Sequence, residues 1–79
     1  MNLEIVTPDS TLFTGTDVLL VQLPGIGGSF EVLDYHAPLI SVLKKGSVKV
    51  ESKGEPPRFF EIKGGVIEVQ NNKILILAE

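Results

Sequence analysis

The sequence predicts an all-β domain, and three observations lead to that prediction. The chain has 79 residues, the length of one domain. It contains nine valines, seven isoleucines and four threonines but only two alanines, a mixture that favours pleated sheets over helices. Eight glycines and five prolines divide it into pieces too short for a long helix. We therefore predict one domain, residues 1–79, forming a two-sheet sandwich or flattened barrel of about eight to ten short strands without C-terminal helices.

Five strands are predicted in the first half of the chain, at residues 3–6, 11–14, 17–23, 29–33 and 39–43. Pro8 and Gly15 end the first two strands, and a flexible break from Pro24 to Gly28 ends the third. The fourth and fifth are separated by the polar corner Asp34-Tyr35-His36 and the Ala37-Pro38 step. We expect the strand at 39–43 to be buried.

Four more strands are predicted in the second half, at residues 47–51, 58–63, 66–70 and 73–78. They are separated by the turn at 44–46, the loop at 53–57, Gly64-Gly65 and Asn71-Asn72. Asparagine tolerates the positive φ of a tight hairpin, so we predict a hairpin at Asn71-Asn72.

Two of the predicted strands, 17–23 and 74–78, carry apolar side chains on both faces. In the strand at 17–23 we expect Val18 and Leu20 on one face, and Leu19, Val21 and Leu23 on the other. Only one face of a sandwich strand can meet the core. The second face is covered either by loops and chain ends or by a partner protein, as contiguous exposed apolar surface usually implies.

Composition and charge exclude several classes of function. Seven Lys and Arg against ten Asp and Glu leave a net charge of −3, which argues against a nucleic-acid partner. The chain has no cysteine, so disulfides, thiol catalysis and cysteine-ligated metals are excluded. No signal sequence opens the chain, and no apolar run approaches the ~20 residues that span a bilayer. We expect a soluble domain with no direct membrane insertion.

The residues supply little catalytic chemistry. His36 is the only histidine, and no acidic cluster accompanies it at metal-ligand spacing. Ser29 follows two glycines but lacks a base to activate it. Residues 25–30 begin like a dinucleotide-binding loop, but Phe30 stands where the third glycine belongs. Three carboxylates are expected on solvent-facing sides of strands: Glu51, Glu61 and Glu68. We predict no catalytic residue, no metal and no cofactor, which indicates a binding or structural module.

Lipoyl and biotinyl carrier domains are the alternative interpretation, because they are small acidic β-sandwiches with an acylated lysine in a hairpin turn. Lys44 and Lys45 lie in such a turn. Those domains place Asp or Met directly before the lysine, whereas Leu43 precedes Lys44 here. The carrier interpretation is therefore the runner-up.

A resemblance to a known family covers almost the whole chain. The most specific segment is residues 28–39, GSFEVLDYHAPL. It is preceded by LEIVTP at 3–8, LFTG at 12–15 and LP at 23–24, and followed by LKKG at 43–46, GGVIEV at 64–69 and NKILILAE at 72–79. In this order and spacing, the segments resemble the N-terminal β-sandwich of the epsilon subunit of F-type ATP synthases, the mitochondrial delta counterpart included.

This resemblance implies a non-catalytic rotor subunit of the central stalk. Such a subunit binds gamma and rests on the ring of c subunits, within an F1 complex of alpha, beta, gamma, delta and epsilon subunits. It passes torque from proton flow toward ATP synthesis, on the cytoplasmic side of the bacterial inner membrane. The resemblance places at the c ring one polar-aromatic corner comprising Ser29, Phe30, Glu31, Asp34, Tyr35 and His36. It places at gamma Thr7, Ser41, Lys63 and Glu68.

The chain departs from the family's usual pattern in this corner. The family usually has glycine at Glu31, Pro-Gly at Asp34-Tyr35 and often an acidic residue at Ser29. Because those glycines permit tight turns, the departures imply either a different loop path or a changed contact surface. Family members typically continue into two helices that can inhibit ATP hydrolysis. Since this chain stops at Glu79, the resemblance implies a coupling role without that inhibitory arm.

Two of the ring-facing positions have a second interpretation. Phe30 fits a core position as well as an interface position. His36 fits a pH sensor at the ring, because imidazole titrates near neutral pH. It also fits a structural hydrogen bond at the Ala37-Pro38 step, and we favour the hydrogen bond.

Overall fold

The computed structural model describes residues 1–79 and contains nine strands and no helix, which confirms the all-β prediction. The strands are β1 (Asn2–Val6), β2 (Thr11–Gly15), β3 (Val18–Gly25), β4 (Gly28–Leu33), β5 (Leu39–Leu43), β6 (Gly46–Ser52), β7 (Arg58–Ile62), β8 (Gly65–Gln70) and β9 (Lys73–Ala78). Every predicted strand is present, with ends shifted by at most about two residues. The structure contains no helix that is long and apolar enough to cross a membrane.

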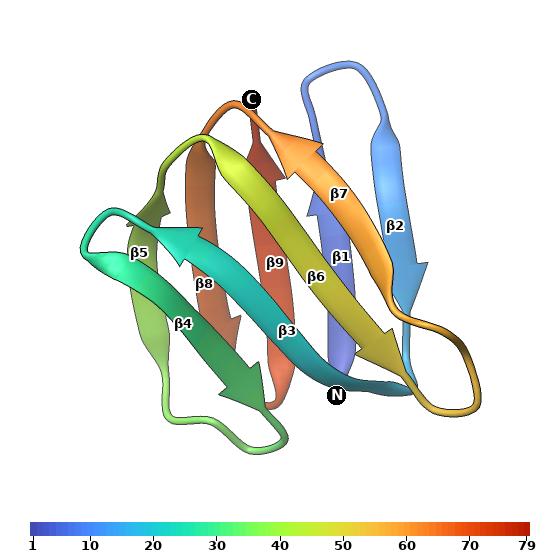
Figure 1. Ribbon diagram of the computed structural model, residues 1–79. Helices are drawn as coiled ribbons and strands as arrows, with labels where there is room; N and C mark the ends of the chain where they lie inside the picture. The colour runs from blue at the N-terminus through green and yellow to red at the C-terminus, as the bar shows by residue number, and fades with distance from the viewer.

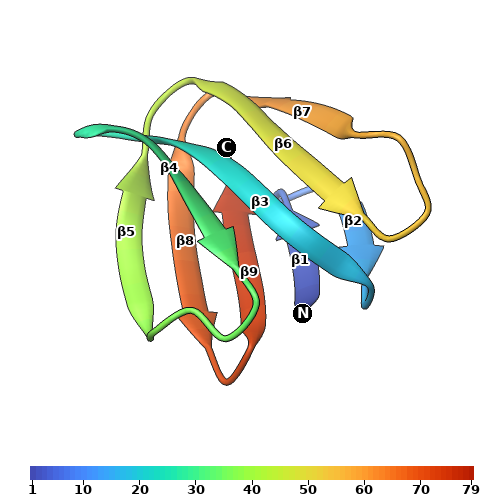
Figure 2. The ribbon, with the colours of Figure 1, turned by 60° about the horizontal axis from the view of Figure 1, so that its bottom comes forward.

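The strands form a curled sheet that folds over into two layers (Figures 1 and 2). The hydrogen-bonded order is β2-β1-β9-β8-β5-β3-β6-β7, and β4 pairs with β3 outside this path. β5 and β3 share a single residue pair, Gly25 with Leu43, and the sheet turns over at that point. One layer therefore comprises β5, β8, β9, β1 and β2, and the other comprises β4, β3, β6 and β7. The first and last strands lie side by side, because β1 pairs with β9 in parallel.

The core lies between the two layers and is wholly apolar. Fifteen hydrophobic residues are buried, and no polar or charged residue is. β8 shows the expected alternation, with Ile67 and Val69 buried and Val66, Glu68 and Gln70 facing outward. Burying a large aliphatic side chain contributes about 1.5–3 kcal/mol, so this alternation fixes which face of each strand points inward.

The expected faces of β3 were partly wrong. The ladder between β3 and β6 shifts register between Val18 and Leu20, as at a β-bulge. The extra residue, Leu19, is 48% exposed, and Val18 turns into the core on the same side as Val21. The predicted break at Pro24 was also wrong, because β3 continues to Gly25, which pairs with Gly28 across a two-residue hairpin turn.

The prediction that strand 39–43 is buried was wrong as well. In β5, only Leu43 is buried, whereas Ile40 is 74% exposed and Val42 is 53% exposed. These two side chains point away from the second layer, and nothing covers that side of the sheet. An apolar run indicates burial, but it does not say whether the burial comes from this chain or from a partner.

Side chains close the sandwich where the two ends of the curled sheet meet. Phe13 on β2 and Phe60 on β7 pack edge to face, with ring centroids 5.6 Å apart. The Arg58 guanidinium lies 5.3 Å from the Phe13 centroid and 5.1 Å from the Phe60 centroid. This cation–π contact shields the end of the core without any backbone pairing between β2 and β7.

Candidate interaction surfaces

The turn after β4 holds a tyrosine in a conformation that glycine usually occupies. The His36 N–H donates to the Leu33 carbonyl at 3.2 Å and closes a four-residue turn. Tyr35 is the third residue of this turn and has φ of 59°. A positive φ at that position is the mark of a type II turn, which favours Gly or Asn. A bulky residue there costs roughly 1–2 kcal/mol, so neighbouring groups must hold it in place.

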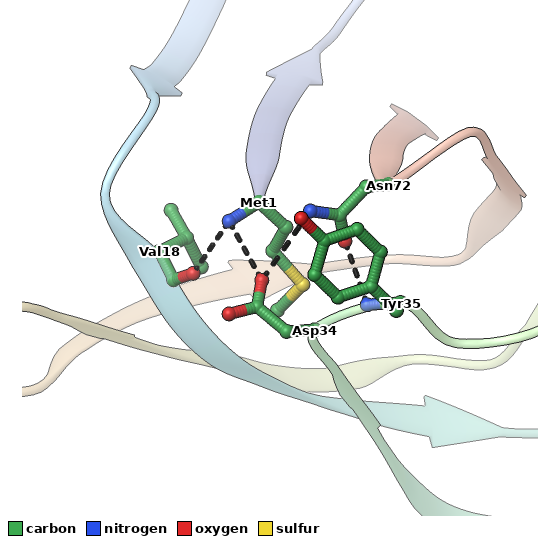
Figure 3. Close-up of polar contacts among 5 residues, drawn as sticks. All are labelled: Met1, Val18, Asp34, Tyr35 and Asn72. Carbon is green, nitrogen blue, oxygen red and sulfur yellow. Dashed lines mark hydrogen bonds and ion pairs between the residues drawn. The ribbon is translucent and has the colours of Figure 1, made fainter.

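Asn72, from the β8–β9 hairpin, supplies the contact to this backbone (Figure 3). Its side-chain carbonyl accepts a hydrogen bond from the Tyr35 N–H at 2.7 Å. Its amide nitrogen lies 3.5 Å from the Asp34 carboxylate, to which it donates. Asn71 and Asn72 have φ of 53° and 58°, which confirms the predicted tight hairpin.

The first residue completes this cluster (Figure 3). The Met1 ammonium group donates to the Asp34 carboxylate at 2.9 Å and to the Val18 carbonyl at 3.0 Å. The hydrogen bond from that ammonium is the main cause that lowers the pKa of Asp34; its positive charge and the Asn72 amide also lower it, and partial desolvation opposes them. The cluster thus ties the chain start, β3, the β4–β5 turn and the β8–β9 hairpin together. We call Met1, Asp34, Tyr35 and Asn72 the clasp.

A row of apolar side chains crosses the outer face of the layer formed by β5, β8, β9, β1 and β2. Val42 on β5 lies opposite Val66 on β8, Val66 opposite Leu77 on β9, and Leu77 beside Val6 on β1. Val42, Val66 and Leu77 are 53%, 39% and 51% exposed, and Val6 is half-buried. Four neighbouring strands therefore present one unbroken apolar row to solvent. We call it the outer row.

Two open hollows border the outer row. One is lined in part by Val6, Thr7, Pro8 and Leu77, at the end of β9. The other is lined in part by Pro38, Ile40 and Glu68, beside β5.

No group of three or more His, Asp and Glu side chains comes together. Glu61 and Glu68 are exposed and Glu51 is half-exposed, as expected for solvent-facing charge. The Glu51 carboxylate forms an ion pair with Lys49, whose Nζ lies 3.1 Å from Glu51 Oε2. The His36 ring is also exposed, and its Nδ1 lies 2.7 Å from the Ala37 carbonyl. This is the local hydrogen bond that the favoured interpretation of His36 requires.

The sequence model of the family described as the ATP synthase delta/epsilon chain beta-sandwich domain matches residues 1–79. The chain belongs to this family. The ATP synthase epsilon chain of Chlorobium limicola is 40% identical over 77 residues, which cover 98% of this chain and 86% of that protein. The ATP synthase epsilon chain 1 of Methylococcus capsulatus is 39% identical over 79 residues, which cover all of this chain and 56% of that protein.

Two solved structures share the fold. One is the central stalk and c ring of Tetrahymena thermophila mitochondrial ATP synthase, with a TM-score of 0.83 and 19% identity over 99% of this chain. The other is the OSCP/F1/c-ring assembly of Euglena gracilis mitochondrial ATP synthase, with a TM-score of 0.89 and 22% identity over 96% of this chain. The chain spans 62% and 48% of the length of the matching chains. The match to the delta/epsilon family therefore decides against the alternative interpretation, a lipoyl or biotinyl carrier domain.

The six ring-facing positions of the epsilon resemblance do not lie in one corner. Ser29 and Glu31 are exposed on the outer face of β4, and Asp34, Tyr35 and His36 form the exposed turn after it. Phe30 alternates with them and points inward. Its ring packs on the core and lies over Gly25, where an added Cβ would come within 2.8 Å of it.

The backbone geometry at Tyr35 and Glu31 decides between a different loop path and a changed contact surface. Tyr35 keeps a glycine-like positive φ, so the turn does not need a different path to accommodate it. Glu31 has no positive φ, and its place in β4 requires no glycine. A changed contact surface therefore remains as the prediction for both residues.

Two of the four gamma-facing positions of the resemblance line the hollows beside the outer row, and a third lies near the end of β9. Thr7 and Glu68 each line one of its hollows. The Lys63 N–H lies 3.5 Å from the Glu79 carbonyl, which places Lys63 near the end of β9. Ser41 is the exception: it alternates with Ile40 and Val42 and is half-buried on the inner side of β5.

Two features of these surfaces lay outside the sequence predictions. The outer row depends on the register of four strands, which only the folded ladder shows. The Asn72 side chain contacts a residue 37 positions away. Its one sequence signal, an asparagine in a hairpin turn, already had a local explanation.

Proposed function

We propose that this chain is a non-catalytic rotor subunit of an F-type ATP synthase, which fastens the gamma subunit to the ring of c subunits. Proton flow turns the ring, and the sandwich passes that torque through gamma toward the catalytic head. The chain would lie at the cytoplasmic face of the membrane, held there only through the complex. Family membership supports the assignment, because the named relatives are ATP synthase epsilon chains.

The outer row is the observation that carries this proposal. Its apolar side chains lie side by side on four strands of a sheet whose other face already packs on the core. Contiguous exposed apolar surface of this kind is typical of a protein–protein interface. We assign it to gamma, because Thr7 and Glu68 line the hollows at its borders.

The exposed side of β4 and the turn at Asp34–His36, which we call the clasp turn, would then face the c ring. Asn72 precedes β9 and Lys63 lies beside its end. A six-residue strand is about 20 Å long, so the outer row, which crosses β9 at Leu77, and the clasp, which includes Asn72, lie at opposite ends of this strand. A close-packed sandwich resists deformation, and it can therefore transmit force between two such regions.

Reconstitution tests the proposal. Membrane vesicles carrying an ATP synthase depleted of epsilon should regain coupling when the chain is added, measured as protons pumped per ATP hydrolysed. The chain should also co-elute with purified gamma. Failure to bind gamma and failure to restore coupling would together remove the proposal.

The same reconstitution also tests whether the chain inhibits ATP hydrolysis. Residues 1–79 are strands, turns and loops, with no helical segment that could extend along gamma. We therefore propose that these residues support coupling without slowing ATP hydrolysis by the head-and-gamma complex. Strong inhibition by the 79-residue chain would contradict this part.

A further inference from the structure

We propose that Asn72 is a positioning residue for the c-ring contact and that Tyr35 is the anchor it positions. The inference rests on the proposed function and extends it to a pair of residues from two distant segments. The deciding observation is the backbone of Tyr35, which is strained at φ of 59° while its side chain is 83% exposed.

Packing within the chain does not account for the strain at Tyr35. Its ring contributes nothing to the apolar core, and no hydrogen bond within the chain engages its hydroxyl. Glycine or asparagine would adopt the same φ more readily. Strain of this sort persists where the surroundings over-determine it, and it points to a use for the side chain outside the fold.

Asn72 provides that over-determination from a rigid base. It lies in the hairpin between β8 and β9, whose inward side chains Ile67, Val69, Ile74 and Ile76 are all buried. Its 2.7 Å hydrogen bond to the Tyr35 N–H fixes the turn, and its amide contact with Asp34 fixes which way the side-chain oxygen points. The tyrosine is thereby set before a partner arrives.

Tyrosine suits such an anchor, since it offers a large amphipathic ring with only two side-chain torsions to immobilise. The neighbouring half-exposed Asp34 carboxylate and exposed His36 give the surface a polar rim. A rim of this kind around an aromatic side chain fits a polar protein loop better than lipid. The clasp turn is therefore matched to the loops of the c ring at the membrane surface, and not to the bilayer itself.

Substitutions by glycine separate docking from folding, because glycine keeps each positive φ. Tyr35→Gly removes the ring and relieves the strain, and Asn72→Gly removes both side-chain contacts. Asn71→Gly is the matched control, since Asn71 has nearly the same φ in the same turn but makes no side-chain contact with the clasp. The double variant of Tyr35→Gly and Asn72→Gly completes a cycle.

All variants are assembled with gamma and the catalytic head, and binding to vesicles containing the c ring is measured beside thermal melting of each chain. We expect Tyr35→Gly to melt at or above the wild-type temperature and to bind about fivefold more weakly. Asn72→Gly should bind about threefold more weakly than Asn71→Gly. It should add nothing in the Tyr35→Gly background.

Each other outcome overturns the inference. Unchanged binding by Tyr35→Gly would show that the ring is not an anchor. Equal binding by Asn72→Gly and Asn71→Gly, or additive effects in the double variant, would show that Asn72 does not act through Tyr35. If the wild-type chain itself neither binds gamma nor restores coupling, the proposed function fails and this inference fails with it.

Discussion

Leu77 lies directly opposite Val66 across the β8–β9 ladder, and both side chains face solvent. Directly opposed apolar residues on one face normally stabilise a sheet through mutual contact and burial. Here the contact is made but burial is incomplete, at 51% and 39% exposure. The pair is therefore the centre of the surface that we assign to gamma.

Leu77→Gln should weaken gamma binding by about fivefold or more and leave the fold intact. An exposed side chain contributes little to folding, whereas an apolar residue at the centre of an interface commonly contributes over 1 kcal/mol to binding. Titration calorimetry with purified gamma measures the affinity, and thermal melting checks the fold.

Phe59→Gln is the control for the outer row. Phe59 is 63% exposed, but it lies on β7 of the opposite layer. The substitution should leave gamma affinity unchanged. Equal weakening by both substitutions would indicate a general loss of apolar surface and would remove the assignment of gamma to the outer row.

Local patterns were enough to predict the nine strands, because alternation and turn residues act over a few positions. They failed at Val18 and Leu19, where a bulge in the β3–β6 ladder reverses the alternation, and at β5, where apolar side chains face outward. Both failures depend on partners outside the local segment. The clasp was beyond reach for the same reason, since it joins the chain start to Asp34 and Asn72.

Phe30→Ala should destabilise the fold, and Tyr35→Ala should not destabilise it comparably. The Phe30 ring packs on the core and covers Gly25, so its removal leaves a cavity at the edge of the core. We expect a loss of about 2–3 kcal/mol in the free energy of unfolding, below the usual cost for a fully buried phenylalanine. Urea denaturation measures it. A Phe30→Ala variant of wild-type stability that couples poorly would restore Phe30 to the ring interface.

Gly65→Ala should be among the most damaging substitutions in the chain. Gly65 has φ of 154°, and an added Cβ would lie 2.3 Å from the Leu77 carbonyl oxygen, which belongs to the paired backbone and cannot move aside. We expect a loss of about 3 kcal/mol or more. At Gly27 an added Cβ meets nothing within 4 Å, so Gly27→Ala should change stability by less than about 0.5 kcal/mol. Similar denaturation midpoints for the two variants would contradict this account.

The Asp34 ion pair should make part of the fold's stability depend on acid. The Met1 ammonium lowers the pKa of Asp34 in the folded chain below its ordinary value of 3.8, so the folded state favours the ionised carboxylate. This contribution is fully present above the unfolded pKa and is lost as pH falls through the lowered folded pKa. Asp34→Asn should therefore be less stable than wild type at pH 6, and the gap should narrow as pH approaches 2. Acetylation of the Met1 amino group removes the ammonium charge. We expect it to lower the stability at pH 6 as Asp34→Asn does, with a gap from wild type that narrows toward pH 2 in the same way. Urea denaturation across pH 2–6 measures both, and a gap that stays constant over this range would show that the ion pair contributes nothing.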